Sequence, residues 1–202
     1  VCSGGMHPVT SFDRPEPMRR DVALDAAISD LPKVDAGHRT DSMPYPGVKT
    51  SFQRLMRRGL VGQPGRLVHD HITRSVRDDD AEAYRLMKEG DTYKDLPRHL
   101  QRYRRDIFND RYKRLSWGEP SRAITAHLAK DGYWYIHPPQ HRTLSVREAA
   151  RIQSFPDRFR FAGAPSHRYR QIGNAVPPLL AGALGAELAR SLTRPVTAKA
   201  HA

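Results

Sequence analysis

The segment YRQIGNAVPPLLAGALGAEL, Tyr169 to Leu188, carries the most specific pattern in the sequence. Pro177 and Pro178 precede an apolar run, and proline is tolerated in a first helical turn because that N–H would be unpaired anyway. Leucines recur every four residues from Leu180 to Leu192, which predicts a helix with one apolar face that packs in a core. The polar turn before it, Gly173-Asn174-Ala175, is either only a helix start or one wall of a ligand pocket.

The charge of the 202-residue chain favours a nucleic-acid partner. Lys and Arg number 34 against 22 Asp and Glu, for a formal net charge of +12. Such an excess attracts polyanions, duplex DNA first, and a solvated basic surface is the alternative. Hydrophobic residues make up 38% of the chain, so we expect long polar loops or a missing packing partner.

Cys2 is the only cysteine, so the chain cannot build a disulfide framework. The absence of a disulfide framework favours a reducing compartment, and we expect a cytoplasmic location. No window approaches the roughly 20 consecutive apolar residues of a membrane span, and no membrane partner is expected.

Several segments carry patterns of regular structure. Helices are predicted for 21–32, which ends at Pro32, and for a segment that Asp79 or Asp80 caps and Gly90 stops. The β-prone segments 123–125 and 133–136, joined by a Lys-Asp-Gly turn, predict two strands. Ser145 and Glu148 form a capping box for a further helix, which Pro156 ends.

Three features raise candidate sites outside the opening segment. His69 and His71 would share a face of an extended segment, but no third ligand stands at a zinc spacing, so no metal is predicted. The glycines in RRGLVGQPGR form a basic loop suited to a nucleic-acid backbone and not a phosphate-binding motif. A run of basic and aromatic residues is either a phosphate- and base-binding surface or a core with a basic rim. Its members are Arg98, Arg102, Tyr103, Arg104, Arg105, Arg111, Tyr112, Lys113, Arg114, Trp117 and Arg122.

Two C-terminal segments, RTLSVREAARIQSFPDRFRFAG (142–163) and RYRQIGNAVPPLLA (168–181), resemble the last two ordered motifs of the cytosine-5 DNA methyltransferases. The upstream segments LDAAISDLP and YKRLSWGEPSRAITAHL are similar to weaker signatures of the same family. The resemblance implies an enzyme that flips a cytosine out of duplex DNA. In that family a Pro-Cys thiolate attacks C6, a Glu-Asn-Val glutamate holds N3, and S-adenosylmethionine methylates C5.

The chain departs from that family in its catalytic and cofactor-binding motifs. It contains no Pro-Cys, no Glu-Asn-Val and no Phe-x-Gly-x-Gly segment, and Cys2 follows Val1. We therefore assign no catalytic residue and expect the chain alone to be inactive. The expected fold is α/β, the C-terminal portion of an S-adenosylmethionine-dependent methyltransferase with a small, irregular, β-containing target recognition domain. The missing N-terminal catalytic portion would act in cis or as a separate subunit.

The resemblance divides the chain into four parts. Residues 1–32 are expected to end the catalytic-domain portion and form a connecting helix, and 33–141 to form the target recognition domain. Residues 142–192 would return to the catalytic domain, and 193–202 would form a disordered tail.

The resemblance also assigns site residues. Gly173, Asn174 and Ala175 match the turn that lies against S-adenosylmethionine, where Gly173 lets a backbone approach. Thr125 matches a threonine that touches the DNA phosphate near the flipped base, and Arg122 is expected to contact DNA. Arg142, Arg147 and Glu148 match positions that organise the recognition domain, and we interpret them as structural.

A second hypothesis from another class stays open. The chain would be a non-enzymatic DNA-recognition subunit that completes a split methyltransferase. A reading frame that continues upstream of Val1 into Pro-Cys and Glu-Asn-Val segments would favour a fragment of one enzyme. A start codon near Val1, beside a gene that carries those motifs, would favour the split form.

Overall fold

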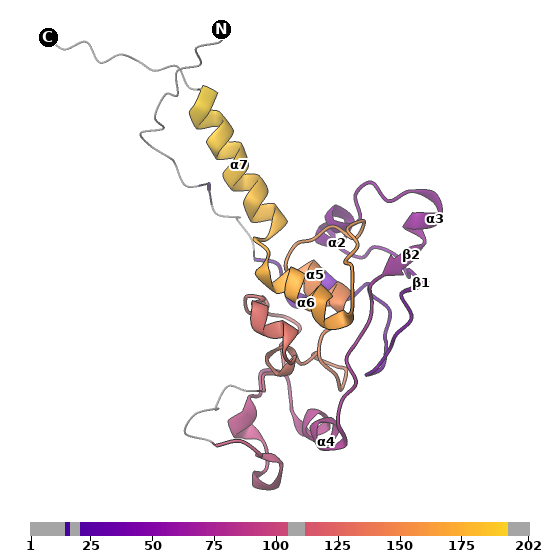
Figure 1. Ribbon diagram of the computed structural model, residues 1–202, viewed down its shortest axis with the longest axis vertical. Coiled ribbons are helices and arrows are strands. Elements are labelled where there is room, and N and C mark those ends of the chain that lie inside the picture. The colour runs from indigo at the N-terminus through magenta and orange to yellow at the C-terminus, as the bar shows by residue number, and fades with distance from the viewer. Residues whose placement is uncertain (1–14, 17–20, 105–111, 194–202) are drawn as a thin grey trace, which may run out of the picture.

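The computed structural model describes residues 15–16, 21–104 and 112–193, and Figure 1 shows their arrangement. Cys2, Arg105, Arg111 and the predicted tail from 194 onward lie outside the described residues. Thr193, which we expected to begin the tail, is the last residue of a helix.

Helix α5 (Val146–Ile152) lies at the centre of the described residues. Its residues from Val146 to Arg151 are all buried. Helices α1 (Leu24–Ile28) and α6 (Pro165–Asn174) pack against it, and α2 (Ser51–Met56) packs against α1. Segments far apart in the sequence therefore meet around one short helix.

Regular β-structure in the described part of the chain is one antiparallel pair. Strand β1 (Ser42–Pro44) pairs with β2 (Leu67–His69), with Met43 opposite Val68. Helix α3 (Gly62–Gly65) leads into β2. The chain thus combines helices with a small sheet and much irregular structure.

The two strands predicted at 123–125 and 133–136 are wrong. Residues 123–125 are irregular and lead into a 3-10 helix, η3 (Ala126–Ala129), and a second one, η4 (Tyr133–Tyr135), replaces the other strand. Tyr135 N–H donates to the Gly132 carbonyl at 2.8 Å and closes the turn. The β-prone residues Ile124 and Tyr135 are buried by tertiary packing, which overrides local strand preference.

The helix predicted to start at Asp79 or Asp80 is α4 (Asp78–Leu86), but both predicted caps are wrong. Arg77 occupies the N-cap without a side-chain hydrogen bond. Asp80 is instead buried in the first turn, where the hydroxyls of Tyr112 and Tyr133 donate to its carboxylate at 2.5 and 3.0 Å. Leu86 ends the helix before the left-handed Gly90.

The other predicted helix boundaries hold in part. The predicted 21–32 helix is shorter, because α1 spans Leu24–Ile28. The capping box of α5 is confirmed: Ser145 Oγ accepts from the Glu148 N–H at 3.1 Å, and Glu148 Oε2 accepts from the Ser145 N–H at 2.7 Å. Gln153 is the C-cap, so α5 ends before Pro156.

Two hydrophobic cores hold these elements. The larger one joins residues of α1, β2, η3, α5 and α6, among them Leu24, Leu128 and Ile172. The smaller one is rich in tyrosine and gathers α4, η1 (Tyr93–Asp95) and η2 (Arg98–Leu100). Figure 1 places α4 at the end of the molecule opposite α7.

Helix α7 (Pro178–Thr193) confirms the predicted proline start and extends away from the rest of the described residues (Figure 1). The predicted core face is wrong for this chain, because α7 buries none of its residues. Leu180, Leu188 and Leu192 are 47%, 45% and 64% exposed. No described helix is long and apolar enough to cross a membrane.

Candidate functional site

The first part of the candidate site is a buried ion pair at the start of α5. Arg142 donates from Nη1 and Nη2 to the two carboxylate oxygens of Glu148, both at 2.7 Å. Burial opposes ionisation of Glu148, but Arg142 and His137 outweigh it and hold its pKa well below the usual range. Arg142 Nε also donates to the Val34 carbonyl at 2.8 Å. The structural role predicted for Arg142 and Glu148 is confirmed.

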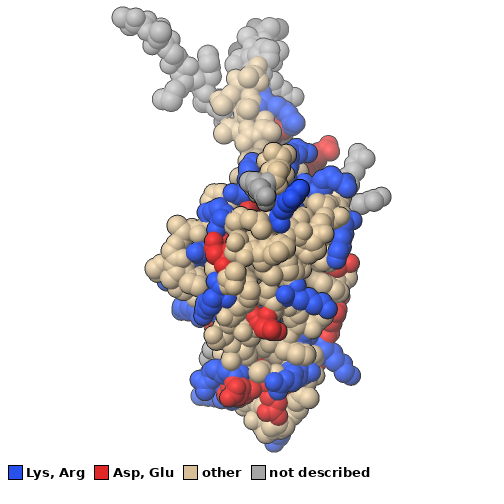
Figure 2. Space-filling model, turned by 90° about the vertical axis from the view of Figure 1, so that its right-hand side faces the viewer, with Lys and Arg blue, Asp and Glu red and all other residues tan. Residues whose placement is uncertain are grey.

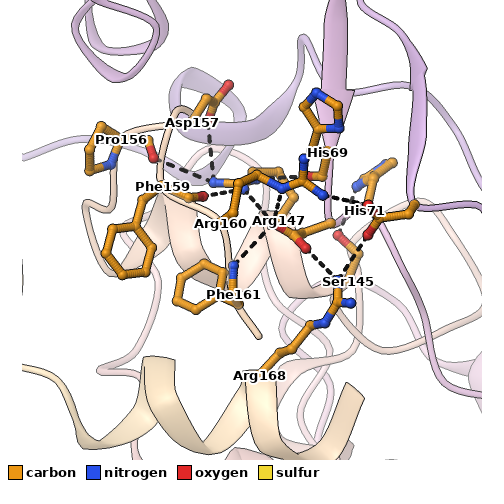
Figure 3. A network of polar contacts seen from close by, with 12 residues as sticks. His69, His71, Ser145, Arg147, Pro156, Asp157, Phe159, Arg160, Phe161 and Arg168 are labelled. Atoms are coloured by element: carbon orange, nitrogen blue, oxygen red, sulfur yellow. Dashed lines mark hydrogen bonds and ion pairs between the residues drawn. The ribbon is translucent and has the colours of Figure 1, made fainter. Parts of the chain in front are cut away.

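Asp70 is the centre of a second network, shown in Figure 3. Arg147 from α5, Arg160 from the following loop and Arg168 from α6 all form ion pairs with Asp70. Arg147 Nη2 lies 2.9 Å and Arg160 Nε 3.1 Å from Asp70 Oδ2. Asp70 has a left-handed φ of 60°, a conformation in which aspartate is found more often than most other non-glycine residues. This network joins β2, α5 and α6.

Arg151 forms the third connection from α5. Its guanidinium donates to both carboxylate oxygens of Asp157 at 2.6 Å and to Asp30 at 2.8 and 3.1 Å. Its Nη1 also donates to the Ala27 carbonyl at 2.9 Å, which ties α5 to α1. Burial disfavours the charged guanidinium, but the two carboxylates outweigh it and raise the pKa of Arg151.

His71 has a structural role in this core. Its Nε2 lies 2.8 Å from the Pro32 carbonyl oxygen and its Nδ1 lies 2.8 Å from Ser145 Oγ. Burial lowers the pKa of His71, so the ring is neutral at physiological pH. Both ring nitrogens of His71 are hydrogen-bonded, and the neighbouring Asp70 is bonded to arginines. These contacts satisfy the buried polar groups of His71 and Asp70, so both residues stabilise the fold.

The Gly173-Asn174-Ala175 segment is not the turn or helix start that the sequence suggests. Gly173 and Asn174 are the last residues of α6, and Ala175 is its C-cap. Gln153 Nε2 donates to the carbonyls of Ala175 at 2.8 Å and Ile172 at 3.4 Å. A helix C-terminus leaves such carbonyls unpaired, so Gln153 is what completes this end.

The start of α7 is held by Ser154, the residue that follows Gln153. Ser154, with a left-handed φ of 62°, accepts the Leu179 N–H on its hydroxyl at 3.1 Å. No motif in the sequence pointed to Ser154 as a residue that holds the start of α7. Asn174 is left exposed between α6 and α7.

Thr125 and Arg122 lie on the surface, and Thr125 lies beside the end of α6. Thr125 N–H donates to the Tyr135 hydroxyl at 3.2 Å, and its own Oγ1 lies 3.4 Å from the same oxygen. The guanidinium carbon of Arg122 lies 4.7 Å from the centre of the Trp134 ring, which also stacks on His127. Both Thr125 and Arg122 are exposed, so each can meet a ligand from solvent.

The basic and aromatic run divides between the two interpretations. Arg114 is buried and donates to the His137 carbonyl at 2.6 Å, and Tyr112 is buried in the smaller core. Arg102 forms ion pairs with Asp79 and Asp80. These three residues are structural. Arg98 and Arg122 are exposed and form no ion pair with a described carboxylate, so both fit a DNA contact.

A basic hollow of about 850 Å³ lies over α2 and α3. Arg54, Arg58 and Arg66 line it and are exposed, and none of its described lining residues is acidic. The RRGLVGQPGR segment, predicted as a loop, contains helix α3, so that prediction is wrong for Gly62–Gly65; its basic residues do line this hollow. Figure 2 shows one face of the molecule with many Lys and Arg side chains and fewer Asp and Glu between them.

Sequence comparison relates the chain to DNA methylases. Residues 33–190 match the family described as C-5 cytosine-specific DNA methylase. Type II methyltransferase M.Bpa9945I of Bacillus paralicheniformis is 37% identical in an alignment 171 residues long, which covers 77% of this chain and 37% of that protein. DNA (cytosine-5)-methyltransferase CMT2 of Arabidopsis thaliana is 30% identical in an alignment 216 residues long, gaps included, which covers 87% of this chain and 17% of that protein.

Structural comparison gives a similar fold. The crystal structure of an E. coli protein, described as a DNA modification methyltransferase encoded within a prophage, superposes with a TM-score of 0.63 at 22% identity. The match covers 88% of this chain and 49% of that protein. The chain therefore spans about half of this structure and about a third of M.Bpa9945I.

Proposed function

Because the chain belongs to the C-5 cytosine-specific DNA methylase family, we propose that it recognises duplex DNA and completes the cofactor and cytosine site of a DNA (cytosine-5-)-methyltransferase. One observation carries the proposal. Helix α6 packs against η3, so the exposed Thr125 and the exposed Asn174 lie at one helix end. A DNA contact and a cofactor contact would thus lie side by side.

The DNA contact is proposed at Thr125 and Arg122. A threonine hydroxyl and an arginine guanidinium both donate to phosphate oxygens, and such contacts position a protein on the duplex. Arg122 is ordered by Trp134, a cation–π contact that contributes roughly 0.5–1 kcal/mol at an exposed site. Residues 33–141 would form the target recognition domain that reads the sequence.

The cofactor contact is proposed at Gly173, Asn174 and Ala175. The exposed amide of Asn174 offers both a donor and an acceptor at the end of α6, as a polar ligand requires. S-adenosylmethionine would supply the methyl group when bound. These residues form only one side of such a site, because the family's glycine loop is not in this sequence.

The family's Pro-Cys and Glu-Asn-Val segments are also not in this sequence. Methyl transfer would therefore need a catalytic portion, in cis or as a separate subunit. Two features support a docking surface for it. The leucine face of α7 is exposed. At the base of α7, a cavity of about 420 Å³ is lined by apolar side chains such as Val22, Phe52 and Leu179.

The test combines binding and activity. The chain alone should bind a labelled DNA duplex with an affinity that falls steeply with salt, because phosphate contacts release counterions. Mixed or fused with a catalytic portion that bears Pro-Cys and Glu-Asn-Val, it should produce 5-methylcytosine from S-adenosylmethionine. If the chain bound DNA but no such combination methylated it, the chain would be a DNA-recognition subunit that does not complete a methyltransferase. A DNA affinity that does not change with salt concentration would refute the proposed DNA surface.

A further inference from the structure

Gly173 makes the closest backbone approach in the proposed site. A Cβ added at Gly173 would lie 2.7 Å from the carbonyl carbon of Thr125 and 2.8 Å from the Cα of Ala126, and closer still to the Thr125 oxygen. These atoms belong to the backbone, so no side-chain rotation can relieve the contact. The backbone approach that the sequence predicted at Gly173 is therefore made by the chain's own Thr125–Ala126 segment.

The same segment is held on its other sides. The Thr125 carbonyl accepts the Leu128 N–H at 3.0 Å and begins η3. At the far end of η3, Arg74 Nη2 donates to the Leu128 carbonyl at 2.5 Å. The Arg74 guanidinium also stacks at 3.8 Å over the ring of Tyr169 in α6. Helix α6 thus meets the start of η3 directly at Gly173, and its Tyr169 is connected to the end of η3 through Arg74.

We propose that Gly173 is a positioning residue for the Thr125 phosphate contact. Only a residue without a Cβ lets the last turn of α6 lie against Thr125, and this packing sets where the Thr125 hydroxyl stands on the surface. The inference rests on the proposed function, since it needs Thr125 to contact DNA. It also means that one packing contact positions Thr125 and the neighbouring Asn174 together.

The alternative is that Gly173 is small for reasons unrelated to Thr125. Glycine inside a helix normally weakens it, and an alanine at an unobstructed helical position stabilises the fold. Gly182 in α7 is such a position, because a Cβ there meets nothing within 4 Å. Gly182→Ala is therefore the matched control for Gly173→Ala: the same substitution inside a helix, without the backbone contact.

The experiment compares both variants in the full chain. Backbone amide resonances of Thr125, Ala126 and Leu128 are recorded without DNA, and affinity is measured for a labelled mixed-sequence duplex. Gly173→Ala should shift those resonances and weaken binding about tenfold, as loss of one hydrogen bond to a charged group does. Thr125→Ala should weaken binding by a similar factor, and the double variant should bind no more weakly than either single variant. Gly182→Ala should change neither readout.

A second variant covers the case in which Gly173→Ala does not fold. Tyr135→Phe keeps the ring and removes the hydroxyl that contacts the Thr125 N–H and Oγ1. It should also weaken DNA binding and shift the Thr125 resonance. Unchanged affinity in folded Gly173→Ala, or in Tyr135→Phe, would overturn the positioning role while DNA recognition stands. A wild-type chain that binds no DNA would overturn the proposed function, and the positioning role with it.

Discussion

Replacing Arg151 by Met tests whether the buried guanidinium holds α1 and α5 together. Arg151 is fully buried and bonds Asp30, Asp157 and the Ala27 carbonyl, so it joins parts of the chain 121 residues apart. Methionine has a comparable length but no charge or donor. The change would leave two carboxylates in the core with fewer donors: Arg57 for Asp157 and Tyr45 for Asp30.

The expected cost is large. Removing one partner of a buried ion pair costs about 3–5 kcal/mol, a substantial share of the roughly 5–15 kcal/mol that stabilises a typical domain. Denaturant unfolding should show a lower midpoint with an unchanged slope, and Tm should fall by about 10 °C. The slope is the check on this interpretation, because an altered slope would indicate a different denatured state or lost two-state behaviour.

The control is Arg190→Met in α7. Arg190 also forms an arginine–carboxylate pair, with Glu187 at 2.6 Å, but its side chain is 74% exposed. An exposed pair of this kind contributes about 0–1 kcal/mol, so Tm should hardly change. If Arg151→Met cost less than about 1 kcal/mol, or no more than Arg190→Met, the claim that this network stabilises the core would be refuted.

Three further predictions follow from the charged and exposed groups. Arg122→Gln should weaken DNA binding evenly across sequences and reduce the slope of log affinity against log salt by about one. Burial lowers the pKa of His71 from its ordinary 6.5, so the unfolded chain binds more protons below that pH and the free energy of unfolding should fall as pH drops through this range. Glu148, whose pKa is held well below 4.5, adds a second loss as pH falls below that value, and His71→Gln should remove only the first loss in a pH series of melting curves. Leu188→Glu, at an exposed position of α7, should change stability by less than about 0.5 kcal/mol yet block methylation recovered with a catalytic portion; a large fall in Tm, or full recovery, would refute a docking role.

Local patterns were enough to predict the helices that depend on residues a few positions apart. The Ser145–Glu148 capping box and the proline start of α7 are confirmed. The quoted C-terminal segments likewise pointed to the family that the comparisons show. A cap needs only its own turn of helix, so its signal is contained in four consecutive residues.

Local preference failed where packing outweighed it. In 123–125 and 133–136, Ile124, Tyr135 and Ile136 bury their side chains without forming a strand, so the β-prone composition did not determine the conformation. The leucine face of α7 was correctly periodic, but periodicity does not say whether a partner covers it.

The sequence by itself determined the charge of this protein, its family motifs and the helices whose caps and periods are local. Only the tertiary structure decided what those residues contact. Folding brings the buried arginines on and beside α5 to their carboxylate partners. Arg142 pairs with Glu148, Arg147 with Asp70, and Arg151 with Asp30 and Asp157. Gly173 lies against Thr125, 48 positions earlier in the sequence numbering, because α6 packs on η3. A buried charge requires an oppositely charged partner, and two backbones in close contact require a residue without a Cβ. The sequence shows both kinds of residue, but only the folded chain shows which partner each one contacts.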